Sequence, residues 1–226
     1  MRLHIVPWTL EGLDLGANLL ELGPGYGAST DLLLPRCQTL TSVEYDPRLA
    51  QRLRDRMRKQ APEGLREQPP EQAREEMSEG CHPERSEGPA VSRPATIEAS
   101  PSERTSGEGK LSILRGDAAD LKLPAAEFDS TVCFMMLHHV IPAPRQDRLF
   151  AEAFRVLRPG GLFAGADSPA GPLLSLLHLG DKVAMVDPNS LPNRLQAAGF
   201  VDVQVDRTRY AFRFRARKPT SGVAYK

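Results

Sequence analysis

Residues 19–29 combine an acid with three closely spaced glycines, a pattern suited to binding a charged small cofactor. The segment reads Leu-Leu-Glu-Leu-Gly-Pro-Gly-Tyr-Gly-Ala-Ser, so Glu21 precedes Gly23, Gly25 and Gly27. Because glycines lack a Cβ atom, they allow a tight strand-to-helix turn whose backbone comes close to a ligand. The chemistry expected here is therefore cofactor binding at the end of a strand.

The glycine pattern alone also fits a dinucleotide site. Gly23-x-Gly25-x-x-Ala28 satisfies the nicotinamide fingerprint, and Glu44 lies about 20 residues further on, where that fingerprint places an acid. A nicotinamide oxidoreductase is therefore one alternative.

Further strand ends with polar side chains narrow the choice. Three more apolar runs end in side chains that could face a ligand, namely Glu44, Asp117 and the pair His138 and His139. In an open parallel sheet, ligands bind beyond the carboxyl ends of the strands, so these groups should meet in one crevice. An acid directly after the third strand fits the nicotinamide alternative poorly.

With these strand ends and the segment Val156-Leu-Arg-Pro-Gly-Gly161, the chain resembles the class I S-adenosylmethionine-dependent methyltransferases, in particular their type 11 small-molecule group. The resemblance covers nearly the whole chain except residues 61–109. It implies an α/β fold with a Rossmann-like, doubly wound, seven-stranded sheet that is parallel except for an antiparallel final strand. It also implies S-adenosyl-L-methionine as the cofactor.

The resemblance assigns cofactor roles to the strand ends. The glycine turn would pass the methionine part, whose ammonium group Glu21 would hold directly or through water. Glu44 would accept hydrogen bonds from both ribose hydroxyls, which suits a two-oxygen carboxylate. The full set of expected cofactor-binding residues is Glu21, Gly23, Gly25, Gly27, Glu44, Tyr45, Asp117, Ala118, Phe134 and Met135.

The adenine and methionine ends of the cofactor would meet the later strand ends. By the same resemblance, Tyr45 would lie against adenine, Asp117 would accept from its amino group, and the N–H of Ala118 would bind a ring nitrogen. Phe134 and Met135 would approach the methionine part through their backbone.

The acids also have structural alternatives. Glu21 and Glu44 could cap helices, and Asp117 could form an Asx turn. Asp46-Pro47 is best explained as an N-cap followed by proline at the first helical position.

Methyl transfer from a sulfonium is an in-line displacement with a neutral leaving group, so positioning matters more than acid–base groups. His138 and His139 are candidate general bases, with packing or backbone hydrogen bonding as the alternative. Asp167, at the end of a strand, is expected to face the crevice and orient the substrate. We expect no metal site.

The methyl acceptor is expected to be a small, apolar metabolite, because residues 168–189 form an apolar, proline-containing stretch where this family often covers its substrate. An rRNA adenine dimethylase is an alternative, since its opening motifs look similar. Its Asn-x-x-Tyr motif is absent, however, because that place reads Phe-Met-Met-Leu-His from Phe134. A catalytically inactive cofactor-binding module is a further alternative.

Residues 61–109 interrupt the domain. They contain seven prolines, five glycines and no aromatic residue, so they cannot build a core, and we expect a disordered, low-complexity insertion. The methyltransferase domain would comprise residues 1–60 and 110–218, followed by a tail over 219–226. The insertion joins a helix to a strand, which places it at the amino edge of the sheet, away from the cofactor.

The chain has 226 residues and equal numbers of acidic and basic side chains. In strand 209–217, alternation puts Arg213 and Arg215 on one face and Phe212 and Phe214 on the other. The arginine face carries no aromatic rings for base stacking, so we expect a solvated face and disfavour a nucleic-acid partner.

Three cysteines without metal-ligand spacing predict reduced thiols and a cytoplasmic location. No apolar run approaches the roughly 20 residues that span a bilayer, so we expect no membrane partner. The sequence does not specify the oligomeric state.

The remaining elements follow from periodicity and end signals. Gly199 is expected to end one helix, and Pro159 and its following glycines another. The expected helices are 47–59, 145–157 and 189–198, and the later strands are 111–115, 128–135, 161–167, 200–206 and 209–217.

Overall fold

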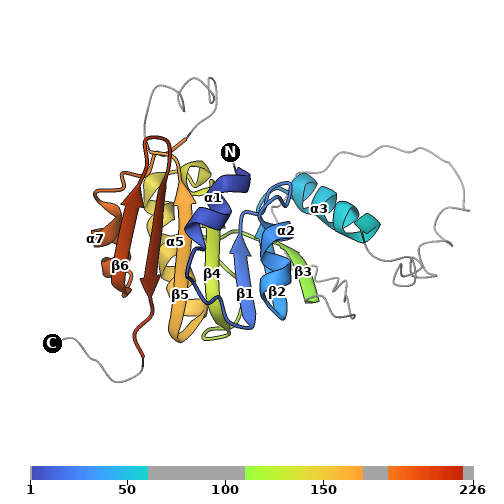
Figure 1. Cartoon of the computed structure of the whole chain (residues 1–226), viewed down its shortest axis with the longest axis horizontal. Helices are drawn as coiled ribbons and strands as arrows, with labels where there is room; N and C mark the ends of the chain where they lie inside the picture. Colours follow the sequence, from blue (N-terminus) through green and yellow to red (C-terminus); the bar gives the residue numbers. More distant parts are fainter. Residues whose placement is uncertain (1, 61–109, 170–182, 221–226) are drawn as a thin grey trace, which may run out of the picture.

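The computed structural model describes residues 2–60, 110–169 and 183–220. A seven-stranded sheet in the order β3-β2-β1-β4-β5-β7-β6 runs through them (Figure 1). Its strands are β1 (Asn18–Leu22), β2 (Thr39–Glu44), β3 (Lys110–Arg115), β4 (Phe128–Phe134), β5 (Leu157–Asp167), β6 (Val201–Arg207) and β7 (Phe212–Arg217). Strand β7 pairs antiparallel with β5 and β6, whereas the other neighbours are parallel. The predicted fold class is confirmed.

Helices cover both faces of this sheet. They are α1 (Arg2–Thr9), α2 (Thr30–Leu33), α3 (Pro47–Gln60), α5 (Ala143–Val156) and α7 (Leu191–Ala197), with 3-10 turns η1 (Leu34–Arg36) and η3 (Leu137–His139). Alternation along β1 sends Leu19 into one core with Leu53 of α3, and Leu20 into a second core with Phe150 of α5. Two buried layers therefore hold the strand ends in place from both sides. Among the described residues, no helix is long and apolar enough to cross a membrane.

Most predicted helix ends agree with the structure. Asp46 accepts the N–H groups of Arg48 (2.7 Å) and Leu49 (3.3 Å) at the start of α3, as an N-cap does. Gly199, with φ of 102°, follows the last turn of α7. The short helices α1 and α2 were not predicted, because four to eight residues give too few turns for a clear periodic pattern.

Two predicted boundaries are wrong: strand β7 begins at Phe212 and not at residue 209, and the end of helix α5 also differs. Helix α5 ends at Val156, and β5 begins at once, before Pro159. Leu157 already pairs with Phe128 of β4. The Lys218 ammonium also lies 2.8 Å from the carbonyl oxygens of Phe154 and Leu157, so a distant residue satisfies carbonyls at the end of the helix.

The arginine face of β7 is confirmed and is tied to neighbouring elements. Phe212 and Phe214 are buried in the core, while Arg213 lies on the opposite face, forms an ion pair with Asp206 (2.9 Å) and stacks over Trp8 at 4.7 Å. Its guanidinium thus connects α1 to the sheet.

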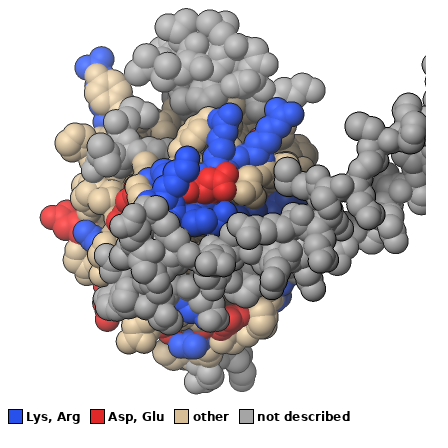
Figure 2. All heavy atoms as spheres, turned by 90° about the vertical axis from the view of Figure 1, so that its right-hand side faces the viewer, with Lys and Arg blue, Asp and Glu red and all other residues tan. Residues whose placement is uncertain are grey.

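Helix α3 carries a second concentration of positive charge that the sequence analysis did not single out. It contains six Arg or Lys side chains and one acid. Figure 2 faces the end of the molecule that carries β3, and it shows Lys and Arg side chains (blue) gathered around an acidic group (red). Arg54 donates to the carbonyl of Ile113 (3.1 Å), and Arg56 pairs with Asp31 at 2.6 Å. Part of this charge therefore attaches α3 to the sheet and to α2.

Asp129 fastens the amino edge of the sheet. Its carboxylate accepts the N–H groups of Asn18 (2.8 Å) and Ala17 (3.0 Å) and pairs with Arg158 (2.7 Å). Burial alone would raise the pKa of this carboxyl, but the two N–H donors and the guanidinium outweigh it and hold the pKa below its usual value.

We expect Asp129→Asn to lower the free energy of unfolding by about 1–2 kcal/mol near neutral pH, because hydrogen bonds to a charged acceptor are lost. Because the pKa of Asp129 is lower in the folded than in the unfolded protein, its charge stabilises the fold at pH values above the unfolded pKa of about 4. This stabilisation disappears as the pH falls through the native pKa. Urea unfolding of both proteins between neutral pH and about pH 3 measures this difference. Asp55→Asn, at an exposed ion pair of 3.9 Å, is the control and should change little. A difference that persists at acid pH would contradict the assignment.

Candidate functional site

The carboxyl ends of β1, β2 and β3 are joined to one another around Glu44. The N–H of Gly25 donates to Glu44 Oε2 at 2.9 Å, and the N–H of Gly116 donates to the Glu44 carbonyl at 2.9 Å. The N–H of Gly23 donates to Val43 at 2.9 Å. Three of the predicted strand ends therefore meet at one edge, beside the change in strand order between β1 and β4.

The glycine turn depends on the missing side chains. Gly23, Gly25 and Gly27 have φ values of 66°, 58° and 82°, which L-residues rarely adopt. A Cβ atom at Gly27 would lie 2.3 Å from Leu53, and one at Gly23 would lie 2.9 Å from Met136. Gly27 thus lets α3 pack against the turn, and Gly23 lets the end of β4 approach it.

Glu21 supports this turn from the interior. Its side chain is 1% exposed, and its carboxylate accepts hydrogen bonds from Ser29 (2.5 Å), Thr30 (2.7 Å) and Ser42 (2.7 Å). These hydroxyls tie β1 to β2 and to the start of α2. A contact between Glu21 and the ammonium group stays a prediction, while the structure gives Glu21 a positioning role.

Glu44 has the acceptor capacity that the ribose role requires. Its oxygens accept the N–H groups of Gly25 (2.9 Å) and Asp46 (3.0 Å), which uses two of about four lone-pair positions of a carboxylate. The side chain is 7% exposed at the sheet edge. Tyr45, the next residue, is 69% exposed and offers a ring at the same edge.

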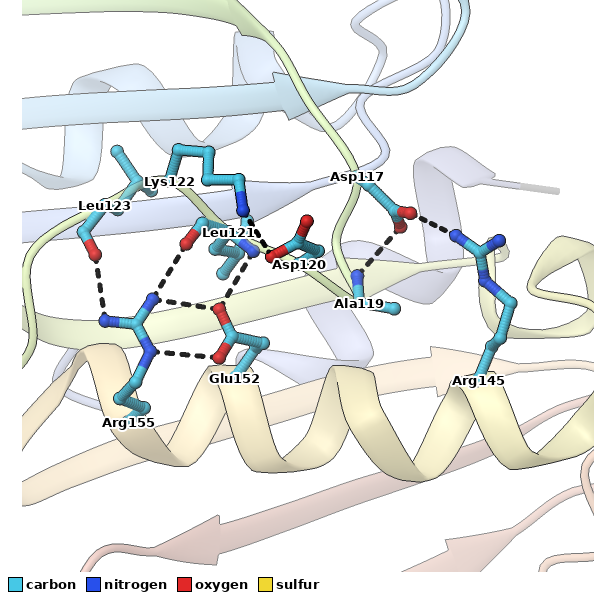
Figure 3. Close-up of polar contacts among 9 residues, drawn as sticks. All are labelled: Asp117, Ala119, Asp120, Leu121, Lys122, Leu123, Arg145, Glu152 and Arg155. Carbon is cyan, nitrogen blue, oxygen red and sulfur yellow. Dashed lines mark hydrogen bonds and ion pairs between the residues drawn. The ribbon is translucent and has the colours of Figure 1, made fainter. Parts of the chain in front are cut away.

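Asp117 forms both a turn and an ion pair. Its Oδ1 accepts the N–H of Ala119 at 2.9 Å, which is the Asx turn considered as an alternative. Its Oδ2 forms an ion pair with Arg145 at the start of α5 (Figure 3). Ala118, which lies between Asp117 and Ala119, is buried. The Asx turn therefore uses one oxygen only, and any adenine amino group would share the other oxygen with Arg145.

The end of β4 makes an unusual backbone turn beside Gly23. Phe134 and Met135 are both buried, and Met135 has φ of 53°, which is rare for a residue with a side chain. The Met135 N–H donates to Ala166 of β5 at 2.8 Å. Strained backbone often accompanies functional sites. The predicted approach of this backbone to the methionine part is compatible with the geometry and stays a prediction.

His138 and Asp167 form a buried pair below this edge. His138 Nδ1 lies 2.5 Å from Asp167 Oδ1, while the N–H groups of His138 (3.2 Å) and Ser168 (2.7 Å) donate to the same carboxylate. Asp167 is 0% exposed, and its carboxylate is enclosed by hydrogen-bond donors. The structure thus gives Asp167 a supporting role for His138, while its expected role in orienting a substrate stays a prediction. His139 is exposed, and its ring lies 4.1 Å from that of His138.

Cys133 lies in the same interior. Burial, and secondarily the charge of Asp167, raise the pKa of this thiol well above its usual value. A protonated buried thiol is a packing group, not a nucleophile.

Gln146 is a site-supporting residue that the sequence analysis missed. It is fully buried, and its amide donates to the carbonyls of Leu137 (3.0 Å) and Ala184 (2.7 Å). Arg194 donates to its other end at 3.0 Å. Gln146 therefore attaches the turn that carries the histidines to α5 and to the chain after β5. A glutamine on the apolar face of α5 was the available signal. Much of the predicted substrate cover lies outside the described residues.

Two family models match parts of this chain. The model of the methyltransferase domain matches residues 91–165. The model of the ribosomal RNA adenine dimethylases matches residues 12–67, which include the glycine turn, β2 and α3.

Curated relatives align with short segments. Ribosomal RNA small subunit methyltransferase A of Methylibium petroleiphilum is 54% identical over 48 residues, which are 21% of this chain and 19% of that protein. Sterol 24-C-methyltransferase erg6 of Aspergillus fumigatus is 37% identical over 62 residues, which are 27% of this chain and 16% of that protein. The alignments thus span less than a fifth of the length of either relative.

Solved structures share the fold over nearly the whole chain. Phosphoethanolamine N-methyltransferase 2 of Haemonchus contortus, in complex with S-adenosyl-L-methionine, has a TM-score of 0.62 at 12% identity and covers 96% of this chain and 52% of its own. The N-methyltransferase NodS of Bradyrhizobium japonicum, in complex with S-adenosyl-L-homocysteine, has a TM-score of 0.58 at 16% identity, covering 96% and 85%. The (4+2)-cyclase SpnF has a TM-score of 0.62 at 16% identity, covering 97% and 81%.

The fold and the family-model matches point to one class. Together, the seven-stranded sheet and the methyltransferase-domain match over residues 91–165 support a class I S-adenosylmethionine-dependent methyltransferase. The presence of a cyclase among the structures of the same fold means that the fold alone does not specify the reaction.

Proposed function

We propose that this protein binds S-adenosyl-L-methionine at the joined ends of β1, β2 and β3 and transfers its methyl group to a small metabolite. The observation that carries the proposal is the placement of Glu44, whose carboxylate meets the glycine turn while its carbonyl meets Gly116, directly before Asp117. A ribose acceptor and an adenine acceptor are thus adjacent.

The residues at this edge fit the cofactor. Glu44 keeps acceptor positions for two ribose hydroxyls, and Asp117 has an oxygen outside its own turn, which it shares with Arg145. The turn at Gly23 would hold the methionine part, supported by Glu21 from below. When bound, the cofactor supplies a methyl group on a sulfonium whose departure leaves a neutral thioether, so the protein mainly has to position the acceptor and exclude water.

The histidine turn supports a role on the acceptor side. His138 Nδ1 lies within hydrogen-bond distance of the Asp167 carboxylate, and a carboxylate can only accept a hydrogen bond. This contact favours the tautomer of His138 that carries its proton on Nδ1 and leaves Nε2 as an acceptor. His139 is exposed beside it. Either imidazole would take a proton from a hydroxyl or amine acceptor, and Asp167 would hold His138 in orientation.

The test combines binding with turnover. Titration calorimetry with S-adenosyl-L-methionine and, separately, NAD distinguishes the proposed cofactor from the dinucleotide alternative. Release of S-adenosylhomocysteine is then measured on a panel of small acceptors of increasing apolar character. Binding of NAD alone would contradict the proposal. Binding of S-adenosyl-L-methionine with no turnover on any acceptor would favour an inactive binding module.

A second candidate acceptor is adenine in RNA. The adenine-dimethylase model match to residues 12–67 favours it. The matched part, however, carries the cofactor turn, whereas the target base in that family is held after the fourth strand, where this chain has Phe134 and the histidine turn. A structured RNA in the acceptor panel separates the two candidates.

The segment between α3 and β3 should be dispensable for cofactor binding. Its flanking residues, Gln60 and Lys110, lie at the end of α3 and the start of β3, so both attach at the amino edge, opposite Glu44. We expect a protein in which a short Gly-Ser linker replaces residues 62–108 to bind S-adenosyl-L-methionine within about twofold of the full chain. Calorimetry on both proteins checks this. Lost affinity in a folded deletion protein would contradict the expectation.

A further inference from the structure

Arg145 holds the carboxylate that is expected to receive the adenine. Its guanidinium forms an ion pair with Asp117 Oδ2, while Asp117 Oδ1 is occupied by the N–H of Ala119 at 2.9 Å (Figure 3). The two side chains are 34% and 31% exposed, so solvent reaches both partners. Each oxygen of Asp117 therefore already has a donor in this structure.

The loop that follows Asp117 has attachments to α5 other than Arg145. Figure 3 shows a separate group of contacts further along α5. Glu152 accepts the N–H of Leu121 at 2.8 Å, and Arg155 donates to the carbonyls of Leu121 and Leu123, both at 2.9 Å. Arg155 also pairs with Glu152 at 2.8 Å. Because these contacts fix the loop, Arg145 acts on the acceptor oxygen and not on the loop as a whole.

We infer that Arg145 competes with the adenine amino group for Asp117 and thereby limits cofactor affinity. The inference rests on the proposed function. A guanidinium can only donate hydrogen bonds, and the 6-amino group of adenine must also donate, so both address the Oδ2 oxygen that lies outside the turn. Oδ2 keeps a second lone pair, but the adenine amino group then meets a carboxylate whose charge is partly neutralised, and the ion pair has to make room for it. Because the pair is partly exposed, the competition is modest and corresponds to a factor of about two to five in affinity.

The test compares Arg145→Met with the wild-type protein by calorimetry with S-adenosylhomocysteine. Methionine keeps an unbranched side chain and removes the charge and the donors. We expect the variant to bind about two- to fivefold more tightly at low ionic strength. The difference in affinity between the variant and the wild type should become smaller at about 300 mM salt, because salt screens the exposed ion pair. Arg148→Met is the matched control. Arg148 is exposed about one helical turn further along the same helix, so its substitution should leave the affinity unchanged.

A second ligand separates competition from a general change in charge. The 6-oxo analogue S-inosylhomocysteine lacks the amino donor, so Arg145→Met should not improve its binding. If the variant binds S-adenosylhomocysteine no better than the wild type, or gains equally for both ligands, the competition is refuted while the proposed function stands. If the folded wild type binds neither ligand at any salt concentration, the proposed function itself fails, and this inference with it.

Discussion

Glu44→Ala is expected to weaken binding of S-adenosyl-L-methionine at least about tenfold, and up to about a hundredfold. A tenfold to hundredfold loss corresponds to about 1.4–2.8 kcal/mol, which is the contribution of one hydrogen bond to a charged acceptor; the carboxylate is placed to accept two from the ribose, and loss of both would take the effect to the upper end or beyond. The substitution also leaves the N–H groups of Gly25 and Asp46 without their acceptor, which loosens the glycine turn. Titration calorimetry on the purified variant measures the loss.

Two further variants show which part of this effect belongs to the cofactor. Glu44→Gln keeps one accepting oxygen and the shape of the side chain, so its affinity should fall between those of wild type and Glu44→Ala. Asp46→Ala removes the cap of α3 next door, where it accepts the N–H of Arg48 at 2.7 Å. It should lower stability by about 1 kcal/mol with little change in affinity. Equal affinity in the wild type and a folded Glu44→Ala protein would contradict the ribose role.

Asp167→Asn is expected to lower the free energy of unfolding by about 2–4 kcal/mol. The buried carboxylate accepts from His138 Nδ1 and from the N–H groups of His138 and Ser168. An asparagine offers one accepting oxygen, and its NH₂ group would face a donor, so at least one buried donor loses its partner. Urea unfolding at neutral pH measures the change.

The control for this prediction is Asp206→Asn. Asp206 is exposed and pairs with Arg213 at 2.9 Å, so its loss should cost less than about 1 kcal/mol. A double variant with His138→Gln should be less destabilised than the sum of its two single variants, because the two side chains contact each other. If Asp167→Asn unfolds like the wild type, the buried pair does not stabilise the fold. If Asp167 positions His138 for proton transfer, the variant's turnover should fall further than its folded fraction does.

The sequence predicted the features that near neighbours encode. Three glycines at alternate positions predicted a tight turn in which side chains would not fit. The left-handed φ values at Gly23 and Gly27 confirm this turn. Asp46 followed by proline began a helix, and Gly199 followed the end of another. Alternation along β7 separated its arginine face from its buried face. In each case the determining atoms lie within a few residues of one another.

Pairings between distant side chains were decided by the tertiary structure. Glu21 and Asp167 stood at strand ends, where the sequence alone predicted ligand contacts, and both prove to be buried beneath hydroxyls or a histidine. Arg145 meets Asp117 across 28 positions of sequence, and His138 meets Asp167 across 29.

A carboxylate at the end of a strand is equally able to bind a cofactor, cap a turn or pair with a basic residue. Its chemistry depends on which donors the packing brings within about 3 Å, and no local pattern contains that information. The sequence by itself therefore determined the class of fold and the edge at which the site lies. The packing of α2, α3 and α5 against the sheet decided which acids remain available to a ligand and which serve the structure.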